Sequence, residues 1–479
     1  MPTRLAPLDV AVLVAYLALM LYLGVRGWKR SQSSSGYLVA GRSLGYGMYV
    51  ACLSAVVLGG ASTVGGTRLG FEHGLSGMWM VFMMGAGVMA LGLFLTNRVS
   101  KLRVLSISEM LELRYDAKAR LVSAVIMAIY AALIAVVQVI AIGTLLTAFL
   151  GWSFWAGMLL GGAVVLFYTF LGGMWSVSMT DSVQWVLMTV GIFFLAVPMG
   201  LARVGGWGAL TRELPHTFFR LDAIGYGEIL SFFLLFCLGL AIGQDIWQRV
   251  FTARDPTVAR RGTIVAGAYC AAYAVATSVI GMIAAVAFPE LQDSQMAFAT
   301  VVVDLLPPGV TGIVLAGTLS ALMSTASGTL LASSTLIAHD VYRRFLVKDV
   351  SDEVFLRKTR LVTGVLGIIL ITIALWIQDV IVALDIAYTL LSGSLFFPIV
   401  AGMVWNRATA SGTLASMGLS AVASSLAMAT WGAGSTPSIL VGLGTSFVTL
   451  VAVSYWPGLA FRNKGGRIRV SKERIGPKT

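Results

Sequence analysis

Hydroxyl side chains gather in one short apolar segment of the sequence, residues 321–329. Ser324, Thr325, Ser327 and Thr329 fall within little more than one helical turn. A hydroxyl oxygen is a neutral, hard donor, so this cluster suits a desolvated monovalent cation when backbone carbonyls complete the shell. The same hydroxyls could instead donate to carbonyls four residues earlier or join neighbouring helices. Chemistry alone favours that second use.

Charged side chains also lie inside or beside apolar runs, where each costs about 2.5–3.5 kcal/mol and is therefore a candidate site residue. Asp181 could be an acid at a helix N-terminus or a cation relay on an inner exit path, and both remain open. Asp245 or Asp385 would suit a cationic amine. Arg68 would suit a carboxylate, although pairing with Glu72 four residues later is the simpler role.

Uncharged polar side chains could face a cavity as well. Ser62, Gln138, Gln244 and Ser392 could each bind a solute, or could equally be satisfied between helices. The sequence has no Walker motif, no zinc-type spacing of His and Cys, and only three histidines. We therefore predict that the protein is not an enzyme and that any transport is driven by an ion gradient or is passive.

The elements that must position these residues are membrane helices. Of 479 residues, 58% are apolar and only 11% are charged, and the mean hydropathy is +0.89. Soluble proteins carry about 25% charged residues, so the lipid bilayer is the solvent here. A span needs about 20 mostly apolar residues, and helices satisfy their own backbone in lipid. Thirteen runs qualify, at about 8–27, 44–70, 77–96, 121–149, 153–173, 178–201, 227–251, 262–287, 308–336, 360–378, 382–405, 410–430 and 437–459.

The formal charge of +12 reflects topology and not a nucleic-acid partner. Lys and Arg lie mostly between alternate apolar runs and in the tail 462–479, which would meet anionic lipid. With the N-terminus outside, all but five of the 33 basic residues lie on the inner side. The positive-inside rule thus predicts an inner-membrane protein with the N-terminus out and the C-terminus in the cytoplasm.

Two of the predicted spans are interrupted by glycine in a similar way. One contains VLGGASTVGG at 57–66 and the other LGLAIGQD at 238–245. Glycine weakens a helix by about 1 kcal/mol relative to alanine. The two spans are five apart, so each could open a five-helix repeat, the second inverted, and such paired breaks indicate the binding site of a transporter. Close packing through small residues is the alternative for either run alone.

With these features, the sequence resembles the sodium:solute symporter family, which includes carriers of proline, pantothenate, sialic acid, glucose and choline. The match covers nearly the whole chain. The segments that carry it are AGRSLG at 40–45, GGMWSVSMTD at 172–181, QRVF at 248–251, ALMST at 321–325, SST at 333–335 and DVY at 340–342.

The resemblance implies an all-α, leucine-transporter-type fold of 13 transmembrane helices. One leading helix (1–43) would precede the first inverted repeat (44–205) and the second (206–406), and two trailing helices with a basic tail (407–479) would follow. The resemblance also implies a sodium site, which reverses the preference given to the hydroxyls above. Its ligands would be the carbonyls of Ala55, Leu58 and Ala321 with the hydroxyls of Ser324 and Thr325.

Further site residues follow from the same resemblance. Some members bind a second sodium through an aspartate that matches Asp181 and two serines, of which Ser327 matches one and Gly328 replaces the other. The match to a second sodium site is therefore incomplete at Gly328. The positions that contact substrate in relatives match Ser62, Gln138, Gln244 and Tyr388.

We therefore predict a secondary active symporter that couples sodium entry to uptake of a small organic solute by alternating access. The solute would be an amino acid such as proline, or a related carboxylate or zwitterion. A proton-coupled or uncoupled carrier on the same fold, a transporter-like solute sensor and a channel remain alternatives.

Overall fold

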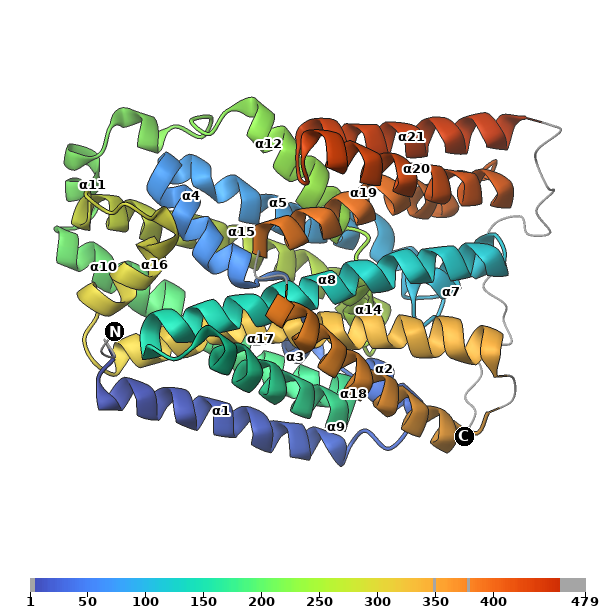
Figure 1. Ribbon diagram of the computed structural model, residues 1–479, viewed down its shortest axis with the longest axis horizontal. Helices are drawn as coiled ribbons and strands as arrows, with labels where there is room; N and C mark the ends of the chain where they lie inside the picture. Colours follow the sequence, from blue (N-terminus) through green and yellow to red (C-terminus); the bar gives the residue numbers. More distant parts are fainter. Residues whose placement is uncertain (1–4, 348–349, 377–379, 457–479) are drawn as a thin grey trace.

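The computed structural model describes residues 5–347, 350–376 and 380–456. Within these ranges the regular elements are helices, and the only β-type pairing is an isolated bridge between Leu44 and Ala253. Most of the long helices run along the longest axis of the molecule (Figure 1). The predicted basic tail lies outside the described residues.

The first half of the chain forms α1 to α11. Their bounds are α1 Pro7–Trp28, α2 Ser34–Val39, α3 Tyr46–Val57, α4 Gly66–His73, α5 Trp79–Ala90, α6 Thr96–Val99, α7 Ile107–Arg114, α8 Ala117–Leu150, α9 Phe154–Thr189, α10 Val197–Val204 and α11 Trp207–Glu213. The second half continues with α12 Tyr226–Phe232, α13 Leu238–Leu240, α14 Gln244–Val250, α15 Pro256–Ala287, α16 Ala297–Thr300, α17 Val310–Thr335, α18 Asp352–Trp376, α19 Val380–Val404, α20 Ala410–Trp431 and α21 Thr436–Tyr455. Short π-helical stretches extend several of these, among them η2 Ala61–Gly65, η7 Phe233–Cys237 and η10 Leu336–Leu346.

Ten described helices are long and apolar enough to cross a membrane, or eleven if the bent pair Tyr226–Leu240 and Gln244–Val250 counts as one span. Two of these segments, Ala61–Val99 and Phe154–Val204, overlap two predicted spans each. Gly74 ends α4 with φ at 60° inside the first, and Gly173 kinks the second with φ at 50°. Glycine adopts positive φ without steric cost, so both segments change direction there.

The helix that carries the hydroxyl cluster, α17, is the most enclosed of the apolar helices. In the segment formed by α17 and η10, 89% of the most apolar stretch is buried, compared with 33% for α1 and 28% for α18. It packs against α8, α9, α1 and α3. Its Ala, Gly, Ser and Thr side chains allow other backbones to approach closely. The hydroxyls therefore lie at the centre of the bundle, while α1, α18 and the α20–α21 pair cover its outside (Figure 1).

Both glycine-rich interruptions predicted from the sequence are breaks in the structure. Helix α3 ends at Val57 because Leu58 leaves the helical region, with φ −93° and ψ 80°. The chain resumes a helical course at Ala61. The second break lies between α13 and α14, where Gly243 is extended at φ −64° and ψ 132° and the axis bends by 45°.

Candidate functional site

The first break leaves backbone groups without helical partners, and side chains from α17 and α8 satisfy them. The Ser324 hydroxyl donates to the Ala55 carbonyl at 2.8 Å, and the Thr325 hydroxyl donates to the Val56 carbonyl at 2.9 Å. Both hydroxyls also lie within 3.2 Å of the Ala321 carbonyl on their own helix. A helix end leaves such carbonyls unpaired. The break and the hydroxyl cluster therefore meet at one point.

The donor set at this point is made of neutral oxygens, from two hydroxyls and three carbonyls. Four of the five predicted sodium ligands, all but Leu58, make these contacts. Leu58 is buried at the break itself, and Thr325 contacts the carbonyl of Val56, two residues earlier. Hard neutral oxygens fit an alkali cation and give a transition metal little to prefer. Among the described residues, no group of three His, Cys, Asp or Glu side chains could hold a metal.

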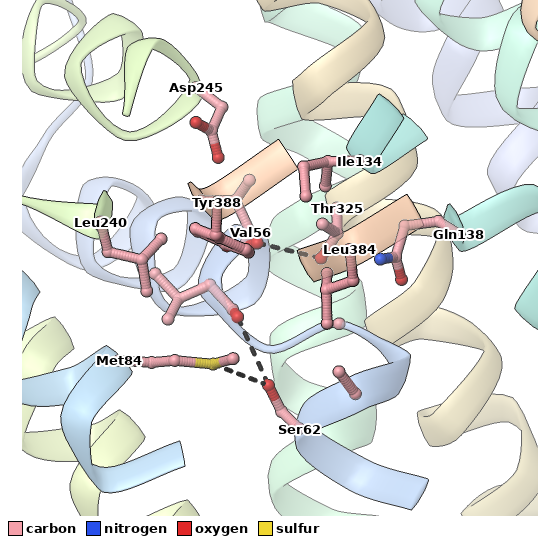
Figure 2. A pocket seen from close by; sticks show the side chains of 13 residues that line it. Val56, Ser62, Met84, Ile134, Gln138, Leu240, Asp245, Thr325, Leu384 and Tyr388 are labelled. Atoms are coloured by element: carbon pink, nitrogen blue, oxygen red, sulfur yellow. Dashed lines mark hydrogen bonds between the residues drawn. The ribbon is translucent and has the colours of Figure 1, made fainter. Parts of the chain in front are cut away.

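A pocket opens directly beside this cluster (Figure 2). It contains about 330 Å³ of space between atoms, including its mouth. Both broken segments contribute to its wall, as do α5, α8, α17 and α19. The lining residues are Val56, Val57, Gly59, Ala61, Ser62, Met84, Ile134, Gln138, Leu240, Asp245, Thr325, Leu384 and Tyr388. Since Val56 and Thr325 belong to both features, an ion at the hydroxyl cluster and a solute in the pocket would be neighbours.

Three of the four predicted solute contacts line this pocket. Gln138 Oε1 accepts a hydrogen bond from the Gly60 amide at 3.1 Å, an N–H that the break has freed. The Ser62 hydroxyl makes a long contact of 3.5 Å to the Val57 carbonyl and a weak hydrogen bond of 3.4 Å to the Met84 sulfur. The Tyr388 side chain also lines the pocket (Figure 2). Gln138 is thus fixed by the backbone, and Ser62 is the freer donor.

Gln244, the fourth predicted contact, is directed elsewhere. Its Oε1 accepts from the Ile107 amide at 2.9 Å, and its Nε2 donates to the Leu105 carbonyl at 3.3 Å, so it joins α14 to the start of α7. The next residue, Asp245, lines the pocket instead. Consecutive helical residues point about 100° apart, so a one-residue difference decides which side chain enters the pocket. Ser392, also considered from the sequence, donates to the Leu235 carbonyl at 3.1 Å.

Two other charged candidates lie away from the pocket. Arg68 donates to Glu72 at 2.9 Å, the simpler role expected from the sequence, and its side chain is about one-third exposed. Asp385 lies against Gly434, in the connection between α20 and α21. Neither residue is part of the pocket wall.

Asp181 forms a fully buried ion pair that the sequence did not indicate. The Arg249 guanidinium donates to Asp181 Oδ2 at 2.9 Å and to the Cys52 carbonyl at 3.2 Å. A Cβ added at Gly328 would lie 2.6–2.7 Å from this guanidinium, so the missing side chain makes room for it. The Ser327 hydroxyl donates to the Ser324 carbonyl at 3.1 Å. The Asp181 carboxylate, which would have to bind a second sodium, is therefore already paired with a guanidinium.

A network of charges joins α7, the start of α8 and η10 at one end of the bundle, on the right in Figure 1. Arg120 pairs with Asp340 and with Glu112, each at 2.7 Å. Glu109 lies 3.2 Å from the His339 ring. These contacts hold a short connecting helix to two of the long helices, and Gln244 ties α14 to the same place.

This network predicts a pH-dependent part of the stability. Burial alone would raise the pKa of Glu109, but the hydrogen bond and charge of His339, the Leu105 amide and Arg120 together lower its pKa to about 2. A lowered folded-state pKa stabilises the fold above the ordinary value of 4.5, and this contribution is lost as the pH falls from there toward 2. We expect Glu109→Gln to lower the unfolding free energy at pH 7 by on the order of 3 kcal/mol.

The measurement is thermal unfolding in detergent at pH 7 and pH 3, and the Gln variant should lose less stability on acidification than the natural chain. The matched control is Glu353→Gln. Glu353 pairs with Arg357 on an exposed helix face, with both side chains about three-quarters exposed, so its loss should change little. Equal behaviour of the two variants at pH 7 would contradict the prediction.

Comparisons with known proteins find similar sequences and a similar fold. The model of the sodium:solute symporter family matches residues 37–419. The sodium/pantothenate symporter of Escherichia coli K12 is 26% identical over 85% of this chain and 87% of its own. The sodium/proline symporter of Salmonella typhimurium LT2 is 28% identical over 85% of both chains. A sodium-coupled sialic acid symporter, solved substrate-bound and outward-open, aligns with a TM-score of 0.81 at 21% identity, over 94% of this chain and 98% of that one.

Proposed function

Since this chain belongs to the sodium:solute symporter family, a family of membrane transporters and not of enzymes, we propose that it couples sodium entry to uptake of a small organic solute. The solute class in this proposal is an amino acid such as proline, or a related zwitterion or carboxylate. Relatives named for proline and pantothenate support it, although at 26–28% identity they do not fix the solute.

The observation that carries the proposal is the meeting of the α17 hydroxyls with the broken end of α3, beside a pocket. In the proposal, sodium binds the carbonyls of Ala55, Leu58 and Ala321 with the hydroxyls of Ser324 and Thr325. The ion would replace the two hydroxyl-to-carbonyl hydrogen bonds between α17 and α3. Sodium binding would thereby change the backbone contacts at the α3 break, which also forms one wall of the pocket.

The solute in this proposal contacts Ser62, Gln138 and Tyr388, which line the pocket. Gln244 is assigned instead to joining α14 to α7, because its amide is bonded there at both ends. We propose one sodium per cycle, since the Asp181 carboxylate is paired with Arg249. Asp181, with Ser327 close to the cluster, then lies on the exit path of the ion.

The proposed architecture is a pair of inverted five-helix repeats, 44–205 and 206–406, within thirteen spans, preceded by 1–43 and followed by 407–479. The N-terminus would lie outside the plasma membrane and the C-terminus in the cytoplasm. Alternating access would come from one helix group rocking against the other. One charge moving inward through 100 mV contributes about 2.3 kcal/mol, or roughly fiftyfold accumulation.

The test is uptake by the purified chain in proteoliposomes, with radiolabelled L-proline and pantothenate as first substrates. An inward sodium gradient should drive uphill accumulation of at least one substrate, and an equal potassium gradient should not. Accumulation driven by a proton gradient without sodium would identify the proton-coupled alternative. Flux that does not saturate and never exceeds equilibrium would indicate a channel, and binding without any flux a sensor.

A further inference from the structure

One carboxylate faces the solute pocket, and it belongs to Asp245. Among the thirteen lining residues it is the only one with a charge. The side chain is 2% exposed, and Figure 2 shows its carboxylate directed toward Tyr388 and Val56. Ser62 lies at the opposite end of the labelled group, so the pocket has an anionic end and a neutral, hydroxyl-bearing end (Figure 2).

The Asp245 carboxylate is in no ion pair among the described residues, although the charge of Arg249 is near enough to act on it. Arg249, one helical turn later, gives its guanidinium to the Asp181 carboxylate and contacts Asp245 only at the backbone carbonyl, at 3.1 Å. The Asp245 carboxylate itself is 3.4 Å from the Tyr130 hydroxyl and is in no ion pair within residues 5–347, 350–376 and 380–456. A buried carboxylate without a paired charge is costly, so its partner is expected to come from the pocket.

The Tyr388 ring lines the same end of the pocket and is held by two further rings outside the lining. Tyr388 packs edge-on against Tyr130 and Phe236, with ring centroids 5.5 and 5.1 Å away. Aromatic faces next to a carboxylate attract a cationic nitrogen, both through the ring quadrupole and through direct charge pairing. The Tyr388 ring and the Asp245 carboxylate, on two different helices, therefore favour the same kind of ligand.

The other solute classes fit this wall less well. A solute with only a carboxylate would find no Lys or Arg in the lining, and Arg68 is occupied by Glu72 elsewhere. A neutral sugar would leave the Asp245 charge buried and unpaired.

We propose that the transported solute carries a protonated nitrogen, which pairs with the Asp245 carboxylate beside Tyr388. This inference rests on the proposed function and narrows its solute to small amines and amino acids. A carboxylate on the solute is not required by any charge in the wall. Where one is present, the sodium proposed at Ser324 and Thr325 would supply a positive charge beside the pocket.

The test is a binding screen on the purified full-length protein by thermal shift, in sodium and in potassium. Nitrogen-bearing probes are L-proline, putrescine and choline. Matched probes without nitrogen are tetrahydrofuran-2-carboxylate, the ring-oxygen analogue of proline, with propionate and glucose. We expect sodium-dependent stabilisation by at least one nitrogen-bearing probe and by none of the nitrogen-free probes.

Sodium-dependent stabilisation that is strongest with a nitrogen-free probe would overturn the inference and leave the proposed function standing. Nitrogen-bearing probes that stabilise the protein equally in sodium and in potassium would support the pairing with Asp245 and contradict sodium coupling. No sodium-dependent ligand in either set would count against both. Because the screen uses the natural chain, it does not depend on the folding of any variant.

A variant then locates the interaction. Asp245→Asn keeps the shape of the side chain and removes its charge, so affinity for the nitrogen-bearing probe should fall ten- to a hundredfold. Sodium dependence should persist. Asp304→Asn, an exposed acid elsewhere, is the matched control and should bind normally. Unchanged affinity in a folded Asp245→Asn protein would overturn the assignment.

Discussion

Replacing Ser324 by alanine and Thr325 by valine together is expected to abolish sodium-dependent binding and uptake. Each hydroxyl lies at the α3 break, 2.8–2.9 Å from a carbonyl that the broken helix leaves free. The variant removes two of the five proposed ligands of the ion, and a polar contact to a charged group contributes about 1.5–3 kcal/mol. Two such losses correspond to a fall in sodium affinity of about a hundredfold or more. The measurement is sodium-dependent uptake in proteoliposomes across a range of sodium concentrations.

The matched control for that variant is Ser334→Ala, on the same buried helix. The Ser334 hydroxyl donates at 2.7 Å to the Leu330 carbonyl of its own helix and makes no contact with the break. This control should fold and transport like the natural chain. If the double variant kept full uptake at unchanged sodium affinity, the ion would not bind at this cluster. Uptake that was independent of sodium in both proteins would favour proton-coupled or uncoupled transport.

The two helix breaks at the candidate site could be predicted from the sequence, because glycine weakens the helix in which it lies. The runs at 57–66 and 238–245 weaken their own helices, and the structure breaks both. The hydroxyls of α17 were visible as a cluster, but their composition alone favoured ordinary helix packing. Only the family resemblance indicated that Ser324 and Thr325 reach another helix, because that contact depends on where the α3 break lies in three dimensions.

What the sequence could not supply was orientation after a break. Gln244 was predicted to contact the solute, yet its neighbour Asp245 lines the pocket. The chain changes direction at Gly243, so the hydrophobic pattern before the break does not predict which face of the seven-residue α14 points into the pocket. The pairing of Asp181 with Arg249 was hidden for a similar reason, since these residues are 68 positions apart and meet only through tertiary packing.

The number of spans illustrates a related limit. Glycines at 74 and 173 change the direction of the backbone inside two long apolar segments. The sequence predicts two spans at each glycine, one on either side of it, whereas the described residues contain ten or eleven helices that are long and apolar enough to cross a membrane. The count therefore depends on how sharply a single residue turns the chain.

The buried pair of Asp181 and Arg249 yields the second large prediction, which concerns stability. Both side chains are almost fully enclosed, so removing one charge strands the other. Breaking a buried pair in this way costs about 3–5 kcal/mol, whereas replacing both partners by neutral groups is often far milder. Asp181→Asn alone and Arg249→Gln alone should therefore lower the unfolding temperature markedly in detergent, and the double variant Asp181→Asn with Arg249→Gln should recover most of the loss.

The same three variants test the role assigned to the guanidinium. Arg249 approaches Gly328 and bonds Asp181, so it holds the position that a second cation would need. In the natural chain the Hill coefficient for sodium should be close to one, as for a single coupled ion. Arg249→Gln leaves the Asp181 carboxylate free, and the coefficient should rise in this variant but not in the double variant, which lacks the charge. Single variants as stable as the natural chain would show that the pair does not form, and a coefficient near two in the natural chain would show that Arg249 does not exclude a second ion.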